Sequence, residues 1–171
     1  MTPLPLALLK KTSVPTTFVV WRLERTEHFP TWSEGIGAEK VGGRWSPKGR
    51  AVIYASVDPA TTILEVAVHK GFATLDVLPH KLVGIEILKP SKVHVVHPAD
   101  VPNKRWLISG SISGGQQKFG ADLLDRHPLV MFPSVVSPPS WNLVVDVGSA
   151  KGLFKLFSDE DFALDTRLNP P

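Results

Sequence analysis

Four polar side chains with the chemistry of a binding or catalytic site stand close together near the start of the chain. They are Arg22, Arg44, Tyr54 and Glu65, and each has apolar neighbours in the sequence. A charged group in an apolar segment is costly to bury unless it is paired or bound to a ligand. The pattern is therefore more typical of a site than of a solvated surface.

These side chains together suit a ligand that carries phosphates and a sugar. The planar fork of arginine matches phosphate oxygens, so two convergent arginines suit a diphosphate. Arg44 follows Gly42-Gly43, where the backbone can pass close to a ligand or a neighbouring chain. Tyr54 offers a ring for stacking and a hydroxyl for a hydrogen bond. Glu65 is a carboxylate able to stabilise positive charge on a sugar ring during glycosidic cleavage.

The same residues also have a purely structural interpretation. Arg22 and Glu65 would then form an ion pair, and Tyr54 would be a core residue with one bonded hydroxyl. Residue types and spacing alone leave both interpretations open.

The composition describes an ordered globular protein of one domain. The chain has 171 residues, of which 43% are hydrophobic and 20% charged. It has no cysteine, which excludes disulfides and thiolate chemistry. The net charge is +3 and the basic residues are scattered, so we expect no direct contact with nucleic acid. The weak positive bias favours a phosphate-bearing small molecule.

Membrane and secretion signals are missing from the sequence pattern. No apolar run is long enough to span a bilayer. The short apolar run at residues 4–9 is interrupted by Pro5 and precedes its lysines, which is the wrong order for a secretory signal. We therefore expect a cytoplasmic protein.

Three other possible motifs lack the sequence context that their function requires. Gly35-x-Gly37 lacks both a preceding strand and the third glycine of a dinucleotide fingerprint. Residues 110–114 resemble a nucleophile elbow, but Ile112 holds the place of the nucleophile. His94 and His97 would point to opposite faces of a strand, which makes them poor joint metal ligands. We expect no metal site.

The residue pattern predicts a mixed α+β fold with more strand than helix, and not a doubly wound parallel sheet. Asp58 and Pro59 predict the start of a helix that carries Glu65 and stops at Gly71. A second helix is predicted at 118–126, a short helical turn at 26–32, and a loop at 33–41. Residues 1–17 read as an irregular arm before one domain at 18–171. Extended segments are predicted at 18–23, 42–46, 51–56, 82–88, 93–96, 129–132, 142–147 and 153–157.

The ordered set of motifs resembles the RES-domain family, which is named for an arginine, a glutamate and a serine. The matching serine is Ser134, and Asn142 stands where the family usually carries an asparagine. The resemblance spans roughly residues 18 to 168. The motifs that carry it are Trp21-Arg22, Gly42-Gly43-Arg44-Trp45-Ser46-Pro47-Lys48-Gly49, Ile53-Tyr54-Ala55-Ser56, Leu64-Glu65-Val66-Ala67-Val68-His69, Phe132-Pro133-Ser134-Val135-Val136-Ser137-Pro138 and Phe162-Ala163-Leu164-Asp165-Thr166-Arg167-Leu168.

Three positions depart from the family pattern. Trp21 stands where the family often has tyrosine, and Ser46 replaces the usual asparagine. Asp146 stands near the family's asparagine-proline pair. We expect these positions to be peripheral to the chemistry, with Ser46 affecting how its loop is held.

The resemblance implies a toxin of a bacterial toxin–antitoxin pair, with a fold similar to ADP-ribosyltransferase toxins. Such a toxin consumes NAD and needs no other cofactor. Its expected partner is an Xre-like helix-turn-helix antitoxin that plugs the active site. A toxin homodimer or a larger toxin–antitoxin complex is compatible with this expectation.

The resemblance also implies a role for each site residue. Arg22, Glu65 and Ser134 would be catalytic, with Arg22 on a phosphate or the adjoining ribose and Glu65 on a ribose hydroxyl. Ser134 would bond the nicotinamide side or fix Arg22. The expected substrate-binding residues are Arg44, Tyr54, Trp45 and Asn142.

The acceptor of the ADP-ribose unit stays open at this point. Water, inorganic phosphate and a protein side chain all follow the same first step. The alternatives are therefore an NAD glycohydrolase or phosphorylase, and an ADP-ribosyltransferase that modifies a specific host protein. A third is a regulatory subunit without enzymatic activity.

Overall fold

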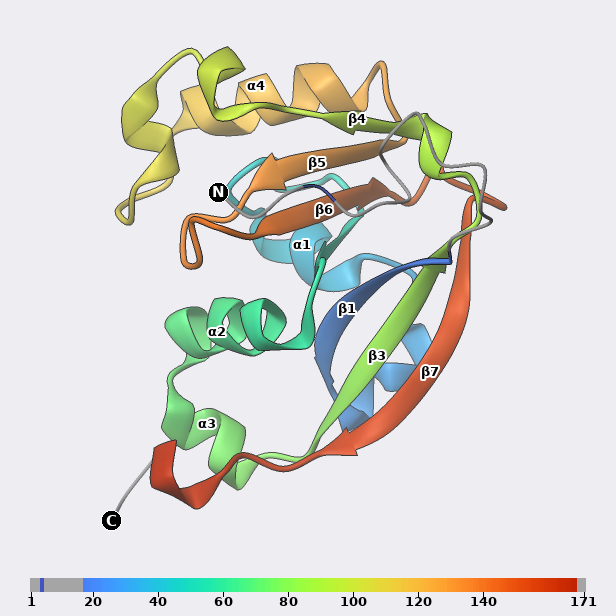
Figure 1. Cartoon of the computed structure of the whole chain (residues 1–171), viewed down its shortest axis with the longest axis vertical. Helices are drawn as coiled ribbons and strands as arrows, with labels where there is room; N and C mark the ends of the chain where they lie inside the picture. The colour runs from blue at the N-terminus through green and yellow to red at the C-terminus, as the bar shows by residue number, and fades with distance from the viewer. Residues whose placement is uncertain (1–3, 5–16, 169–171) are drawn as a thin grey trace.

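The computed structural model describes Leu4 and residues 17–168. The expected irregular arm therefore lies almost entirely outside the described residues. Within them, a seven-stranded sheet has the strand order β4-β5-β6-β2-β1-β3-β7 (Figure 1). The strands are β1 (Phe18–Arg25), β2 (Val52–Ser56), β3 (His80–Ile87), β4 (Val93–Val95), β5 (Leu129–Pro133), β6 (Trp141–Asp146) and β7 (Phe154–Phe162).

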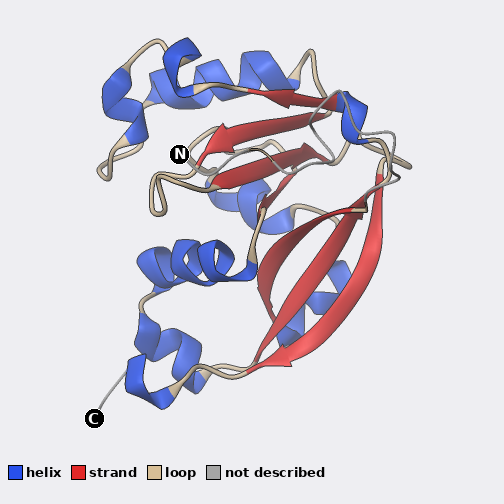
Figure 2. Ribbon diagram, in the orientation of Figure 1, coloured by secondary structure: helices blue, strands red, loops and turns tan. Residues whose placement is uncertain are grey.

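Helices cover the sheet at several places, which confirms the mixed and strand-rich α+β class (Figure 2). All the strand pairs are antiparallel except β4 with β5. The α-helices are α1 (Ile36–Val41), α2 (Pro59–Lys70), α3 (Phe72–Val77) and α4 (Gly114–Leu124), and the 3-10 helices include Thr26–Thr31.

The sheet divides between β1 and β2. Strands β1 and β3 pair along their full lengths, whereas β1 and β2 pair at only one position, Trp21 with Ser56. Figure 1 shows the two halves of the sheet running at a steep angle to each other. A ladder that stops after one position frees backbone polar groups and opens space for side chains. The residues around this junction are therefore candidates for a site.

The largest hydrophobic cluster joins residues from the two halves of the sheet. It combines Phe18, Val20 and Ile85 from one half with Ile53 and Leu143 from the other. A second cluster packs α4 on β2, β5 and β6. A third packs α2 and α3 near β1. Each half of the sheet is thus held by its own helices and by the shared core.

Most predicted elements are present, and the helix that carries Glu65 has the predicted bounds. Asp58 caps α2, Pro59 is its first residue, and Gly71 ends it with a positive φ of 79°. The strand from Ala51 is confirmed as β2, which begins one residue later. The strong N-cap and C-cap signals explain why the bounds of this helix can be predicted from the sequence.

Other predictions were wrong in extent or in kind. The segment at 42–46 is a bent loop and not a strand, and the loop at 33–41 contains α1. Helix α3 was not predicted. Helix α4 begins at Gly114 and not at Lys118, because a capping box of Ser113 and Gln116 starts it despite two glycines. Strand β7 continues to Phe162, although a run of acidic residues hides it from the sequence pattern.

No helix among the described residues has the length and apolar character needed to cross a bilayer.

Candidate functional site

Glu65 is held by two side chains that reach it from the other side of the junction. Its Oε1 accepts hydrogen bonds from Ser134 Oγ at 2.8 Å and from Asn142 Nδ2 at 2.5 Å. Among the described residues nothing donates a hydrogen bond to Oε2. The carboxylate is therefore fixed through one oxygen and offers the other, and the side chain is only partly buried. Glu65, Ser134 and Asn142 are brought together as a group.

Three contacts hold α2 so that Glu65 reaches this position. Thr62 Oγ1 donates to the carbonyl of Trp21 in β1 at 2.8 Å. Asp58 accepts from the backbone N–H of Thr61 at 2.7 Å, which caps the helix. Asp58 also accepts from Ser140 Oγ at 2.7 Å, at the end of the loop that carries Ser134. The helix is thus tied both to β1 and to the β5–β6 loop.

The pKa of the Asp58 carboxyl lies below its ordinary value. Burial by itself would raise the pKa, but hydrogen bonds from Thr61 and Ser140 outweigh it and favour the charged form. An ionised Asp58 also suits the N-terminus of a helix. The clamp between α2 and the loop therefore stays charged at neutral pH.

The loop from Ser134 to Ser140 is closed by its own hydrogen bonds. The N–H of Ser134 donates to the carbonyl of Ser140 at 3.0 Å, and the N–H of Ser140 donates to Ser137 at 2.7 Å. The hydroxyl of Ser134 also accepts from the N–H of Ser137 at 2.9 Å. Because its hydroxyl is held on both sides, Ser134 is a fixed donor to Glu65.

Arg22 pairs with Glu24 and not with Glu65. Its Nε donates to Glu24 Oε2 at 2.8 Å, and its Nη2 contacts the same oxygen. Its Nη1 donates to the backbone carbonyl of Tyr54 at 3.1 Å, across the junction between β1 and β2. The structural interpretation of an Arg22–Glu65 ion pair is therefore wrong about the partner.

A groove of about 240 Å³ opens beside Arg22 and Glu24. His28, Trp32 and Lys40 are among the other residues that line it. The groove gives a ligand access to the guanidinium group, but in this structure Glu24 occupies two of its donors.

Tyr54 contacts both Arg22 and the loop that carries Arg44. Its carbonyl accepts from Arg22, and its hydroxyl lies 2.9 Å from Ser46 Oγ and accepts from the N–H of Trp45 at 3.1 Å. Burial raises the pKa of the Tyr54 hydroxyl, although its hydrogen bonds and Arg44 act in the opposite direction. The hydroxyl therefore stays protonated and fixes the loop that carries Arg44.

The Gly42-Gly43 pair is needed by the protein itself. A Cβ at Gly43 would lie 2.5 Å from the Tyr54 hydroxyl oxygen, so the backbone must be bare there. The neighbouring Gly42 has a φ of 77°, which favours glycine. The fully buried Ser46 bonds the same hydroxyl, in agreement with its expected effect on the loop.

Trp45 lies in the core. It is 2% exposed and stacks on Phe132 at a ring-centroid distance of 4.4 Å. An indole buried in this way has no free face for a ligand, so its part is to anchor the loop. Arg44 next to it is half-buried, with one long hydrogen bond of 3.4 Å to the carbonyl of Trp106. The structure does not bring Arg44 into contact with Glu65.

Two residues of the site were missed by the sequence analysis. Glu24 lies two residues after Arg22 on the same strand face, and Ser56 lies two residues after Tyr54 in the same way. Ser56 Oγ donates to Asn142 Oδ1 at 2.7 Å. The alternation of a strand was the signal that could have found both.

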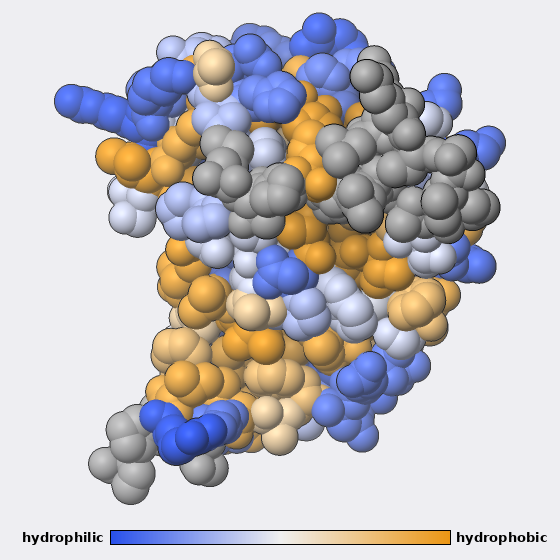
Figure 3. Space-filling view, in the orientation of Figure 1, coloured by the Kyte–Doolittle hydropathy of each residue, from blue (hydrophilic) through white to orange (hydrophobic). Residues whose placement is uncertain are grey.

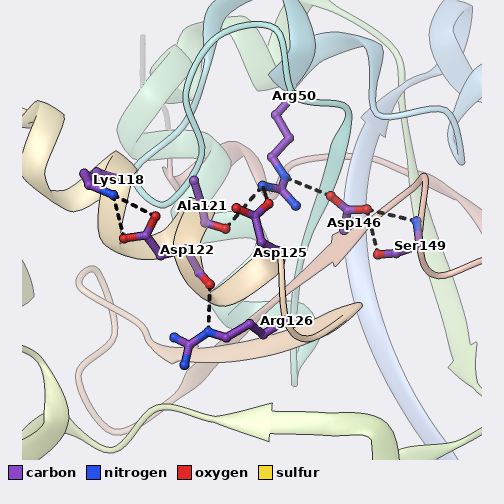
Figure 4. Close-up of polar contacts among 8 residues, drawn as sticks. All are labelled: Arg50, Lys118, Ala121, Asp122, Asp125, Arg126, Asp146 and Ser149. Atoms are coloured by element: carbon purple, nitrogen blue, oxygen red, sulfur yellow. Dashed lines mark hydrogen bonds and ion pairs between the residues drawn. The ribbon is translucent and has the colours of Figure 1, made fainter.

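Asp146 makes its contacts away from Glu65, and its expected peripheral role stays a prediction. It lies at the other end of β6 from Asn142, where it accepts from Arg50 Nε at 2.8 Å and from Ser149 (Figure 4). Burial alone would raise the pKa of Asp146, but these hydrogen bonds lower it below its ordinary value. Arg50 also reaches Asp125 at the end of α4, so this cluster ties α4 to the sheet.

Metal ligation finds no support in this part of the molecule. Among residues 17–168, no group of three or more histidine, aspartate or glutamate side chains is placed to hold an ion. The candidate site is instead the Glu65 carboxylate with its two donors, while Arg22 meets the backbone of the buried Tyr54 at the same strand junction.

Comparison with known proteins assigns the chain to a family. The sequence pattern of the RES domain matches residues 19–165, which include every residue of the site. The chain belongs to the RES-domain family. The arginine, glutamate and serine of its name correspond to Arg22, Glu65 and Ser134 in the resemblance described above.

Several relatives of this RES protein are named as toxins. It is 36% identical to "Toxin Res" of Photorhabdus laumondii over 162 residues, covering 88% of this chain and 96% of the relative. It is 34% identical to the "Prs ADP-ribosylating toxin" of Sphingobium sp. strain YBL2, covering 70% of this chain and 76% of the relative. The chain is a toxin of the RES type.

The fold of this RES toxin also has a solved counterpart. The structure is similar to a chain in the crystal structure of the M. tuberculosis MbcT–MbcA toxin–antitoxin complex, with a TM-score of 0.64. The two chains are 18% identical, and the match covers 92% of this chain and 90% of the other. At this identity the likeness shows a shared fold.

Proposed function

We propose that this RES toxin cleaves the bond between nicotinamide and ribose in NAD. The observation that carries the proposal is the geometry of Glu65. Both protein hydrogen bonds reach Oε1, and Oε2 is left to accept from a ribose hydroxyl. A carboxylate placed beside the ribose would stabilise the positive charge that develops there as nicotinamide leaves.

The reaction needs no electron acceptor. The bond between C1 of the ribose and the nicotinamide nitrogen breaks, and its electron pair leaves with neutral nicotinamide. An oxygen of water or phosphate then bonds to C1 and loses its proton. The products are nicotinamide with ADP-ribose, or nicotinamide with the phosphorylated form of ADP-ribose. No cofactor other than NAD as substrate enters the proposal.

The arginines would hold the diphosphate of NAD. Arg22 opens onto the groove, and its bond to the Tyr54 carbonyl sets its position at the junction. Arg44 is half-buried and makes one long hydrogen bond among the described residues, which leaves guanidinium donors for phosphate oxygens. Tyr54 acts through its hydroxyl by holding the Arg44 loop.

The test is NAD turnover by the chain purified without a partner. NAD would be incubated with and without phosphate, and the products resolved by chromatography and mass. We expect nicotinamide release, and Glu65→Gln should lower kcat roughly 100-fold, because removal of one charge-stabilising group typically costs that much. Glu39→Gln changes an exposed glutamate of α1 and should leave kcat unchanged. Full activity in Glu65→Gln would contradict the role of Glu65.

A second candidate function is transfer of ADP-ribose to a specific protein. The relative named an ADP-ribosylating toxin favours it. The same assay separates the two functions when a cell extract and NAD labelled in the adenosine part are supplied. Label on a discrete protein, with little free ADP-ribose, would support transfer in place of hydrolysis or phosphorolysis.

We further propose that an antitoxin covers the face of α2 next to Glu65. Leu64 and Val68 lie on one side of Glu65 around α2 and are 40% and 63% exposed, and Figure 3 shows apolar surface over α2 and α3. A solved relative of this fold comes from a toxin–antitoxin complex. In the turnover assay, a co-purified Xre-like antitoxin should abolish nicotinamide release, and Val68→Asp should restore it by placing a charge in the interface. Undiminished turnover in the complex would contradict this placement.

A further inference from the structure

Ser56 occupies the one position of β2 that is paired on both sides. Its Cα partners are Trp21 in β1 and Asn142 in β6. No other residue of β2 has a ladder partner in β1. Because both halves of the sheet determine its position, Ser56 is a rigid point at the centre of the junction.

The hydroxyl of Ser56 forms its hydrogen bond with Asn142. It donates to Asn142 Oδ1 at 2.7 Å, and Ser56 is 3% exposed. The other end of the same amide donates from Nδ2 to Glu65 Oε1 at 2.5 Å. Ser56, Asn142 and Glu65 thus form a chain of hydrogen bonds from the centre of the sheet to α2.

The direction of this chain follows from donor and acceptor chemistry. An ionised carboxylate only accepts, so Asn142 must turn its NH2 group toward Glu65. The amide oxygen then faces Ser56, and the hydroxyl satisfies it. Without that hydroxyl the amide oxygen loses its partner, and the amide plane is free to tilt away from the line to Oε1.

We propose that Ser56 is a positioning residue of the NAD-cleaving site and acts on Glu65 through Asn142. It keeps the asparagine donor on Oε1, alongside Ser134, so that Oε2 remains open to a ribose hydroxyl. This inference rests on the proposed function. It adds a residue that lies inside the sheet and acts without a hydrogen bond of its own to the carboxylate.

The test is a double-mutant cycle on nicotinamide release. Ser56→Ala should lower kcat roughly tenfold and change the KM for NAD less than twofold, because small displacements of a catalytic group mainly affect the transition state. Ser56→Thr keeps the hydroxyl and should restore most of the rate. In an Asn142→Ala background, Ser56→Ala should cause no further loss, because the path to Glu65 is already broken.

Ser158→Ala is a matched control. Ser158 lies in a strand, and its Oγ is buried with no hydrogen-bond partner among the described residues. Removal of this hydroxyl should leave kcat unchanged. Ser56→Cys is of similar size with a weaker donor, and it gives an intermediate loss that can be measured if the alanine variant does not fold.

A second measurement does not depend on turnover. In the folded wild type, the side-chain NH2 of Asn142 should exchange slowly with solvent by NMR, and Ser56→Ala should speed this exchange at least several-fold. Unchanged exchange, or rate losses that add in the double mutant, would overturn the positioning role. Absence of NAD cleavage in a wild type with a protected Asn142 amide would overturn the proposed function and leave the hydrogen-bond chain intact.

Discussion

At the scale of single residues, the pairing of Arg22 with Glu24 limits which guanidinium donors are open to a ligand. The side chains are 22% and 11% exposed, so the ion pair is screened only in part. Glu24 holds two of the guanidinium donors that a phosphate would need. Glu24 therefore competes with the phosphates of the proposed substrate for the guanidinium group of Arg22.

Removal of the Glu24 charge should tighten NAD binding. Glu24→Gln leaves Arg22 charged and bonded to the Tyr54 carbonyl, and frees its fork for a phosphate. We expect the KM for NAD to fall roughly threefold to tenfold, because a larger fraction of the protein is ready to bind. Steady-state kinetics measure this change.

Glu27→Gln is the control for that measurement. Glu27 pairs with Arg25 and His28 at the surface and does not contact Arg22. Its replacement should leave the KM unchanged. An unchanged or higher KM in Glu24→Gln would contradict either the competition or the phosphate role of Arg22.

At the scale of elements, helix α2 is the part that must be placed correctly. Its N-terminal cap and its bond to the Ser140 loop share one carboxylate, Asp58. Thr62 adds the tie to β1. The position of Glu65 therefore depends on contacts at the start of the helix, about two turns before the carboxylate.

Asp58→Ala should affect both stability and activity. Loss of an N-cap costs about 1–2 kcal/mol of unfolding free energy. Because the helix also loses its tie to the Ser134 loop, we expect kcat for NAD cleavage to fall tenfold or more. Denaturant unfolding and the turnover assay measure the two effects.

Two variants separate the roles of Asp58. Asp58→Asn keeps a capping oxygen and should retain most of the stability. Ser113→Ala removes the N-cap of α4, a helix that does not carry Glu65. It should lower the unfolding free energy by a similar amount with no loss of kcat. Equal activity losses in Asp58→Ala and Ser113→Ala would mean that general destabilisation explains both.

At the scale of the whole molecule, two half-sheets meet at one ladder position, and the site lies across their junction. The strand β3 that supports β1 starts at His80, which is 1% exposed. Its Nδ1 lies 2.6 Å from the carbonyl of Leu78, so Nδ1 carries the proton. Its Nε2 is buried and has no partner among the described residues.

This histidine should make the stability of the fold depend on pH. Burial lowers the pKa of His80 below 6.5, and Lys70 and Arg25 add to this effect against Glu24 and the Leu78 carbonyl. The unfolded chain then binds the proton first, so stability is fully present above about pH 6.5 and falls as the pH decreases. Denaturant unfolding at pH 7.5 and 5.5 should show this loss.

The His80→Gln variant should have a flatter dependence between those two pH values. His28→Gln changes an exposed histidine and should keep the wild-type slope. If the unfolding free energy of His80→Gln still fell as steeply with decreasing pH as that of the wild type, other groups would be the cause of the pH dependence.

Much of the candidate site can be predicted from local sequence signals. Asp58, Pro59 and Gly71 predicted the bounds of α2, and Glu65 was placed on it. The order of motifs by itself indicates the RES family. The Gly42-Gly43 pair was recognised as a place of close approach, although the structure shows that the ring of Tyr54 fills it.

The sequence by itself indicated which residues would carry the proposed chemistry, and it determined which helix presents the carboxylate, because caps and turns act within a few residues. Only the tertiary structure decided their partners. Arg22 meets Glu24 and Tyr54, Trp45 lies in the core, and Ser56 reaches Glu65 through Asn142. These contacts join strands far apart in the chain, and the register between such strands depends on packing of the whole sheet.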